Sequence, residues 1–203
     1  MSRMVADVNA EERPDSRARL LAAAIAAFSV KGFHGTTTRD LAAAAGMSPA
    51  ALYVHHRSKE ELLYLISRTG HEHTLDLVRR TLAATDGPAP QLAAVMREFA
   101  ADHARSHTTA RIVNYELAAL DPEHHTEILE LRHAISAEIR GLVQRGIDSG
   151  DFHVPDAGMT ASALMSLGID VARWYRPDGA WSPDDIGEFY AELALRIAGH
   201  RPG

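Results

Sequence analysis

The chain has 203 residues, of which 46% are hydrophobic and 24% are charged, and its formal net charge at pH 7 is −6. These proportions are those of an ordinary globular protein, so they exclude a largely disordered chain. The absence of cysteine excludes a disulfide framework, a thiolate zinc site and a cysteine nucleophile. No apolar run is long enough to span a bilayer, and the polar N-terminus lacks the apolar core of a secretory signal. We therefore expect a cytoplasmic protein with no membrane partner.

The charge is distributed unevenly along the chain. Residues 1–60 contain eight Lys or Arg and six Asp or Glu, whereas residues 61–203 contain thirteen and twenty-one. A basic head joined to an acidic body is typical of a nucleic-acid-binding module attached to a domain with another role. Local fluctuation in composition would give the same imbalance, so charge alone leaves both interpretations open.

Apolar residues recur with helical periodicity along almost the whole chain, and strand signals are scarce. Residues 1–15 are polar, and we expect them to form a flexible arm. The first helix is expected over about 16–31, with an apolar stripe at Leu20, Ala24 and Phe28 and a C-cap at the following glycine. Further helices are expected over about 38–45, 49–55, 59–84, 89–106, 108–120, 122–150, 156–175 and 183–199. The sequence therefore predicts an all-α protein with about nine helices.

Polar residues mark the starts of several of these helices. Thr37 is a good N-cap, with Asp40 in the first turn where its charge suits the helix dipole. Ser58 and Glu61 have the spacing of a capping box, so a long helix is expected to begin directly after Ser58.

The two short helices over 38–45 and 49–55 have the lengths of a helix-turn-helix, with the turn at Gly46. In that motif the second helix enters the major groove of DNA, and the residues near its N-terminus meet base edges. Small residues in the first helix permit a close crossing, and Leu52 stands where the second helix needs an inward apolar anchor. Short helix pairs also occur in many bundles, so the spacing alone allows a purely structural role.

The run GFHGTTTRDLAAAAGMSPAALYVHHRSKEELL, residues 32–63, resembles the signature of TetR-type transcriptional repressors. The resemblance covers about residues 16–65. It implies a helix-turn-helix DNA-binding domain over 16–60 and a ligand-binding and dimerisation domain over 61–203. His56 departs from the family pattern, which usually has an aromatic residue there, and its imidazole adds a polar group that must be satisfied.

The resemblance implies DNA-binding roles around the two short helices. Thr38 and Arg39 would touch the DNA backbone or the groove edge. Tyr53 would donate its hydroxyl to a phosphate, and Lys59 would bind a phosphate at the start of the next helix. Because the reading face is rich in Ala and Pro, we expect readout through thymine methyl groups and DNA shape. The full set of expected DNA-binding residues is Thr37, Thr38, Arg39, Ser48, Pro49, Ala50, Ala51, Tyr53, Val54, His55 and Lys59.

The resemblance also implies a homodimer on a palindromic operator of double-stranded DNA, because members of the family pair their last two helices with those of a partner. The residues expected at this dimer interface are Leu164, Gly168, Val171, Tyr175, Phe189, Leu193 and Ile197. Each of the two helices could instead bury its apolar stripe within one subunit.

A third implication is a cavity for a small hydrophobic effector, whose binding shifts the two recognition helices and releases the operator. The residues expected to contact this effector are Phe99, His103, His107, Tyr115, Arg173 and Trp174. The run RWYRP, residues 173–177, is similar to TetR-type regulators of fatty-acid and steroid breakdown, some of which sense acyl-coenzyme A thioesters. An arginine of this run would then meet the anionic part of the thioester. The alternatives are an aromatic drug-like effector with control of an efflux system, and an ordinary core without a ligand.

Other functions have less support in the sequence. His103 and His107 stand four residues apart, a spacing that can bind a metal, but a third ligand would have to come from elsewhere, and we predict no metal site. No Ser-His-Asp register, glycine-rich phosphate loop or HExxH motif occurs, so we predict neither an enzyme nor a cofactor. The main alternative is a small-molecule-binding protein with a vestigial helix-turn-helix. The Ala- and Pro-rich reading face and His56 leave this interpretation open. The sequence does not separate a repressor from an activator.

Overall fold

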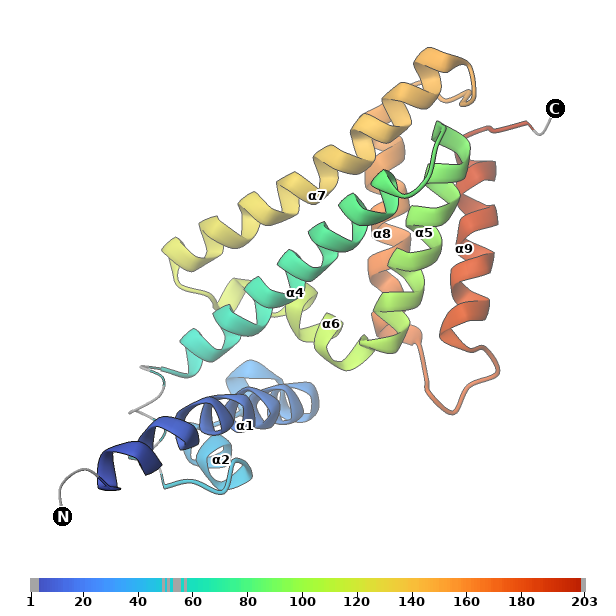
Figure 1. Cartoon of the computed structure of the whole chain (residues 1–203). Helices are drawn as coiled ribbons and strands as arrows, with labels where there is room; N and C mark the ends of the chain where they lie inside the picture. Colours follow the sequence, from blue (N-terminus) through green and yellow to red (C-terminus); the bar gives the residue numbers. More distant parts are fainter. Residues whose placement is uncertain (1–3, 49, 51, 53–55, 57, 202–203) are drawn as a thin grey trace.

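The computed structural model describes residues 4–48, 50, 52, 56 and 58–201, with side chains from residue 16 onward. Within this part every regular element is a helix, which confirms the all-α prediction (Figure 1). The elements are α1 (Met4–Gly35), α2 (Thr38–Ala44), α4 (Lys59–Ala83), α5 (Pro88–Arg105), α6 (His107–Tyr115), the 3-10 helix η1 (Leu117–Ala119), α7 (Pro122–Ser149), α8 (Ala157–Trp174) and α9 (Pro183–Ile197). The helix expected over 49–55 lies largely outside the described residues, and no element carries the label α3. None of the described helices is both long and apolar enough to cross a lipid bilayer.

The helices form a small head and a larger body (Figure 1). α1 and α2 make up most of the described head, which lies at one end of α4. In the body, α4 and α7 run side by side as long helices, while α5 packs against α8 and α9. α6 packs against α1, α4 and α8, so it joins the body to the head at a second place, apart from the covalent link through α4.

One hydrophobic cluster runs from the head into the body. Leu20 and Phe28 of α1 and Leu41 of α2 belong to it, as do Leu62 of α4 and Ile112 of α6. All five side chains are at most 2% exposed. Burying a large apolar side chain contributes roughly 1.5–3 kcal/mol. The shared cluster therefore makes the packing of the head depend on the position of the body helices.

Side-chain caps make the helix starts that the sequence predicts. Thr37 Oγ1 accepts the N–H of Asp40 at 3.1 Å, and the Asp40 carboxylate accepts the N–H of Thr37 at 2.9 Å, so α2 begins with a capping box. Ser58 Oγ accepts the N–H of Glu61 at 3.0 Å at the start of α4. A second capping box begins α9 at Ser182.

The boundaries of α1 differ from the prediction at its N-terminal end. α1 begins at Met4, so the backbone of residues 4–15, expected within a flexible arm, is helical and continuous with the rest of the helix. At the other end, Gly32 breaks the helix with a φ of +69°, a conformation that glycine adopts easily, and one more turn ends at Gly35.

The helix expected over about 108–120 is interrupted at Glu116, where α6 ends and η1 follows. The Glu116 carboxylate accepts the backbone N–H of Phe33 at 3.4 Å. The interruption therefore adds a polar contact between the end of α6 and the head.

The close packing of α8 on α5 depends on a glycine. A Cβ at Gly168 would lie 2.5 Å from Cδ1 of Phe99, whose ring is itself buried. The situation at Gly141 on α7 is different, because the nearest heavy atom to a Cβ there would lie 3.6 Å away.

We expect Gly168→Ala to destabilise the protein, because the added methyl group overpacks the α5–α8 contact at a cost of about 1–3 kcal/mol. Gly141→Ala is the matched control, and it is expected to raise the free energy of unfolding by up to about 1 kcal/mol through helix propensity. Urea unfolding followed by circular dichroism measures both changes. A Gly168→Ala protein at least as stable as the native one would show that the α5–α8 packing described here is wrong.

Candidate nucleic-acid interface and ligand cavity

The ammonium group of Lys59 holds the turn between α1 and α2. Its Nζ donates to the carbonyl oxygens of Phe33 at 2.8 Å and Thr36 at 2.9 Å, and it lies 4.1 Å from the centroid of the Phe33 ring. An ammonium group has three N–H donors, so two of them are engaged by the protein itself. Lys59 thus joins α4 to the turn that precedes α2, whereas the resemblance to the family predicts that it binds a DNA phosphate.

The start of α2 is fixed by charge as well as by its cap. Hydrogen bonds from the backbone and hydroxyl of Thr37, with a further one from Lys31 at 3.1 Å, lower the pKa of Asp40 to about 2. The carboxylate therefore stays charged at any ordinary pH and keeps the capping box intact. Thr38, half-buried, and Arg39, exposed, follow directly on this fixed turn.

The described part of the helix-turn-helix agrees with the expected layout. Ser48 and Ala50 are exposed, as residues of a reading face must be, and Leu52 is fully buried, as its anchor role requires. His56 is 5% exposed, and its Nδ1 lies 4.0 Å from the carboxylate of Glu61. The remaining expected DNA-binding residues lie outside the described residues: Pro49, Ala51, Tyr53, Val54 and His55.

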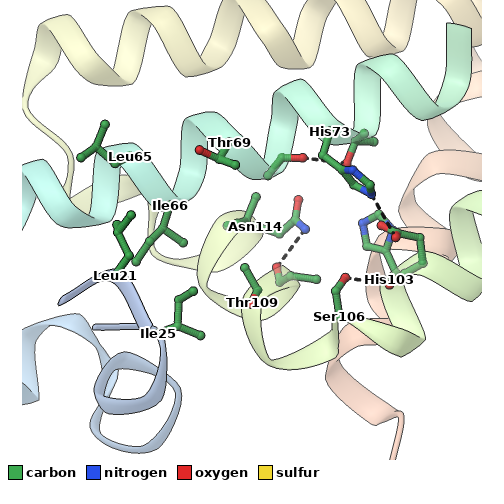
Figure 2. Close-up of a pocket in the computed structure, with 15 residues that line it drawn as sticks. Leu21, Ile25, Leu65, Ile66, Thr69, His73, His103, Ser106, Thr109 and Asn114 are labelled. Carbon is green, nitrogen blue, oxygen red and sulfur yellow. Dashed lines mark hydrogen bonds and ion pairs between the residues drawn. The ribbon is translucent and has the colours of Figure 1, made fainter. Parts of the chain in front are cut away.

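A cavity of about 330 Å³ lies where the head meets the body (Figure 2). Its walls come from α1, α4, α5 and α6. The end nearest the head is apolar and is formed by Leu21 and Ile25 of α1 with Leu65 and Ile66 of α4 (Figure 2). Gly70 brings α6 close to α4 beside the cavity, since a Cβ there would lie 2.8 Å from a methyl group of Val113.

The opposite end of this cavity is polar. His73 Nε2 lies 3.1 Å from a carboxylate oxygen of Asp102, and His103 and Ser106 complete this end (Figure 2). Burial lowers the pKa of His103, so its ring is neutral at pH 7. His103 Nδ1 lies 2.8 Å from the carbonyl oxygen of Phe99, which can only accept, so Nδ1 carries the proton and Nε2 is left as an acceptor.

A smaller inner cavity of about 30 Å³ adjoins the first, and the two share Thr74, His103, Val113 and Asn114 as lining residues. His71 and Arg132 line the inner cavity alone. Burial, reinforced by the charge of Arg132, lowers the pKa of His71 to about 4. The inner cavity therefore combines a neutral imidazole with a charged guanidinium.

The structure brings together only some of the residues expected at the effector site. Phe99 lines the inner cavity and His103 lines both. Tyr115 and Arg173 line a different cleft of about 640 Å³ between the C-terminal ends of α1 and α8 and the helix α6, where Arg173 also pairs with Asp170 at 3.4 Å.

His107 and Trp174 line neither the two cavities nor that cleft. His107 Nδ1 lies 3.0 Å from the carbonyl oxygen of Ala104, and Trp174 is partly exposed with its ring edge-on to Trp181. Sequence reasoning missed Leu21 and Ile25. Their signal was a second apolar face on the first helix, next to the stripe that was recognised.

The residues expected at a dimer interface fall into two groups. Four are buried within the subunit, where α8 packs on α5: Leu164, Gly168, Val171 and Tyr175. Phe189 is 58% exposed, and Leu193 and Ile197 are half-buried. The stripe read from the sequence of α8 therefore faces the subunit core, while Met159, Leu167 and Trp174 are its exposed large apolar residues.

Among the described residues, the histidines His103 and His107 do not form a metal-binding group. One cluster in this part of the chain does bring three potential ligands together, Glu60, Asp121 and His124. The Glu60 carboxylate already accepts the backbone N–H of Asp121 at 3.0 Å and lies 2.8 Å from His124 Nδ1. The cluster thus joins the N-terminal end of α4 to that of α7.

Comparison with known proteins matches two separate segments of the chain to family models. The model for "Bacterial regulatory proteins, tetR family" matches residues 20–64, and the model for the "Tetracyclin repressor-like, C-terminal domain" matches residues 85–198. The chain belongs to the TetR family. It is thus a sequence-specific DNA-binding transcriptional regulator, with its helix-turn-helix in the matched N-terminal segment.

Relatives of this TetR-family protein include a transcriptional repressor. The repressor KstR2 of Rhodococcus jostii is 30% identical over 182 residues, which are 88% of this chain and 89% of KstR2. A tetR-family regulatory protein from Rhodococcus RHA1 has a solved structure that is 37% identical, with a TM-score of 0.87 over 92% of this chain and 98% of that one. AibR, solved in complex with isovaleryl coenzyme A and operator DNA, shares the fold at 22% identity, with a TM-score of 0.81 over 88% and 97% of the two chains.

We expect Lys59→Met to weaken operator binding without changing its salt dependence, because the variant loses the hydrogen bonds to the turn before α2 and no phosphate contact. Fluorescence anisotropy with operator DNA selected in vitro, repeated over a range of salt concentrations, measures both quantities. Arg80→Met, which loses only an exposed ion pair with Asp76 on α4, is the control and should bind almost as tightly as the native protein. A direct phosphate contact by Lys59 would instead lower the slope of log affinity against log salt by about 0.9, which would contradict this prediction.

The low pKa of His71 predicts an acid-sensitive stability. The folded pKa of about 4 is below the ordinary value of 6.5, so between these values the unfolded chain binds the extra proton. The contribution of this histidine to the free energy of unfolding is therefore fully present above about pH 6.5 and decreases as the pH is lowered towards 4. Below pH 4 the titration of His71 lowers the free energy of unfolding no further. His71→Gln should reduce the slope of unfolding free energy against pH in this window, measured by urea unfolding. Identical slopes in the two proteins would contradict a neutral buried His71.

Proposed function

We propose that this protein is a repressor that binds a palindromic operator as a homodimer, and that a small, mainly apolar effector in the 330 Å³ cavity releases it. The observation that carries the proposal is the position of the cavity. Leu21 and Ile25 of α1 form its apolar end, while the rest of its wall belongs to α4, α5 and α6. A ligand in this cavity touches the head and the body at the same time.

Release follows from the contacts around the cavity. The head is tied to the body through α4, through the α1–α6 packing and through the contact of Glu116 with Phe33. An effector that fits better when α1 and α6 are separated shifts the population towards that arrangement. Since the same shift moves the helix-turn-helix, ligand and operator then bind with opposite preferences.

An acyl thioester of coenzyme A is the effector class that we favour. The volume of about 330 Å³ is at the lower end of the range for small-molecule pockets, so it suits a short or compact acyl group whose coenzyme A moiety stays outside. The similarity of the fold to AibR, which was solved with isovaleryl coenzyme A, supports this choice. An aromatic drug-like effector is the alternative that the same apolar wall would accept.

The exposed apolar residues of α8 and α9 support the homodimer. Met159 is 74% exposed, Leu167 and Trp174 are each 39% exposed, and Phe189 on α9 is 58% exposed. Large apolar side chains exposed on α8 and α9 are what a surface covered by another protein would present. A two-fold partner would also place two helix-turn-helix heads on the two halves of an operator.

We expect a short-chain acyl-coenzyme A to raise the Tm of the protein and to lower its operator affinity, whereas free coenzyme A does neither. A ligand at about 100 times its Kd adds roughly 2.7 kcal/mol of stability, which a thermal shift detects readily. The panel should include acyl-coenzyme A thioesters, free coenzyme A, free carboxylic acids and flat aromatic drugs, each tested again in an operator-binding assay.

The outcomes of this panel separate the parts of the proposal. Stabilisation by aromatic drugs alone would replace the thioester with the drug-like alternative. A ligand that binds in the cavity and raises the Tm, but leaves operator affinity unchanged, would refute the coupling between cavity and head.

A further inference from the structure

We propose that the inner end of the cavity is an anion subsite, in which Arg132 binds a carboxylate carried by the effector. The proposal rests on the effector role of the cavity proposed above and adds a chemical requirement for the ligand. Arg132 lies on α7, is half-buried, and lines the inner cavity together with His71 and Asn114.

The partners of this guanidinium are both neutral. Arg132 Nη1 lies 3.1 Å from Oδ1 of Asn114 and 3.3 Å from Nε2 of His71. His71 Nδ1 lies 2.7 Å from the carbonyl oxygen of Ser67, which can only accept, so Nδ1 carries the proton and Nε2 offers its lone pair to Arg132. The low pKa of His71 agrees with a neutral ring.

No carboxylate among the side chains that the structure describes lies within 4.0 Å of the Arg132 guanidinium. The contrast with neighbouring arginines is clear, because Arg68 and Arg79 of α4 reach across the same α4–α7 contact and pair with Glu127 at 3.3 Å and Glu138 at 2.8 Å. Those two pairs are on the solvent side, where an arginine needs a partner least. Burial lowers the pKa of Arg132, which means that its charge is disfavoured where it stands.

The remaining donors of Arg132 suit a carboxylate. Within the described residues its hydrogen bonds use Nη1 alone, so Nε and Nη2 provide the parallel fork that a carboxylate accepts in two bonds. A cavity needs about 10–15 Å³ to hold one water, so the inner cavity of about 30 Å³ has room for a group with two oxygens and little more.

The two adjoining cavities define the shape of such a ligand. Its carboxylate lies at Arg132, and its apolar body passes between Thr74 and Val113, which line both cavities, into the larger one. Its other end lies against Leu21 and Ile25 of α1. The carboxylate can belong to a free acid or to the far end of the acyl chain of a thioester, and the two sources are distinguished by testing both.

The test compares acids with their neutral counterparts on the full-length protein. The probes are octanoate and octanamide, 3-phenylpropanoate and its amide, and adipyl-coenzyme A with hexanoyl-coenzyme A, each titrated by thermal shift. We expect the carboxylate of at least one pair to bind about tenfold or more tightly than its neutral counterpart, as a charge-assisted hydrogen bond in a partly buried site provides. If only adipyl-coenzyme A is preferred over its neutral counterpart, the carboxylate belongs to the acyl chain of a thioester. If a free acid is preferred over its amide, the carboxylate belongs to a free acid.

Three variants connect this preference to the residue. Arg132→Gln keeps a donor for Asn114 and should abolish the preference for the acid, while Arg140→Gln, at an exposed position on the same helix, should retain it. Arg132→Lys keeps the charge without the fork and is the substitute variant if Arg132→Gln does not fold. It should fold normally and show a reduced preference for the acid over its neutral counterpart. Equal binding of acids and neutral counterparts, binding of none of the probes, or a preference that persists in the folded Arg132 variants would overturn the proposal.

The same titrations distinguish failure of the subsite from failure of the proposed function. Acids that bind through Arg132 without any change in operator affinity leave the subsite in place and refute effector-controlled release. If neutral ligands release the operator as effectively as acids, the release mechanism stands and the subsite is refuted.

Discussion

The packing of α6 against α1 is the contact on which the rest of the structure depends. The buried residues of α1 and α2 belong to a core that also includes Leu62 of α4 and Ile112 of α6. The cavity is a gap in that same contact, with Ile25 on one side and Val113 near the other. Because the described residues of the head share their core with α4 and α6, we expect a change in the spacing of α1 and α6 to move the helix-turn-helix.

Local sequence signals predicted the features that depend on neighbouring residues. The caps at Thr37 and Ser58, the break at Gly32 and the buried anchor at Leu52 all follow from residue types within a few positions of each other. Features that depend on which helices meet could not be obtained in this way. Periodicity showed that Leu164 lies on an apolar face of its helix, but only the packing on α5 shows that this face points into the subunit.

The same limit applies to Lys59 and Arg132, whose surroundings come from residues distant in the sequence. Lys59 follows a helix cap, where a phosphate contact is a natural expectation, and only the approach of the turn at Phe33 shows that its ammonium group is engaged within the protein. Arg132 resembles any surface arginine in the sequence, since its isolation from carboxylates depends on three helices. A partly buried charge between neutral partners reduces stability and is therefore expected where a ligand completes the site.

We propose that occupation of the 330 Å³ cavity moves the head away from its DNA-binding arrangement. Ile25→Trp tests it without any ligand, because the larger side chain fills the apolar end of the cavity from α1. The operator affinity of this variant should fall by about fivefold or more, as a coupling of at least about 1 kcal/mol requires, while Ala22→Trp, at an exposed position of the same helix, serves as the control. Native operator affinity in an Ile25→Trp protein whose new tryptophan is shielded from a fluorescence quencher would contradict the account.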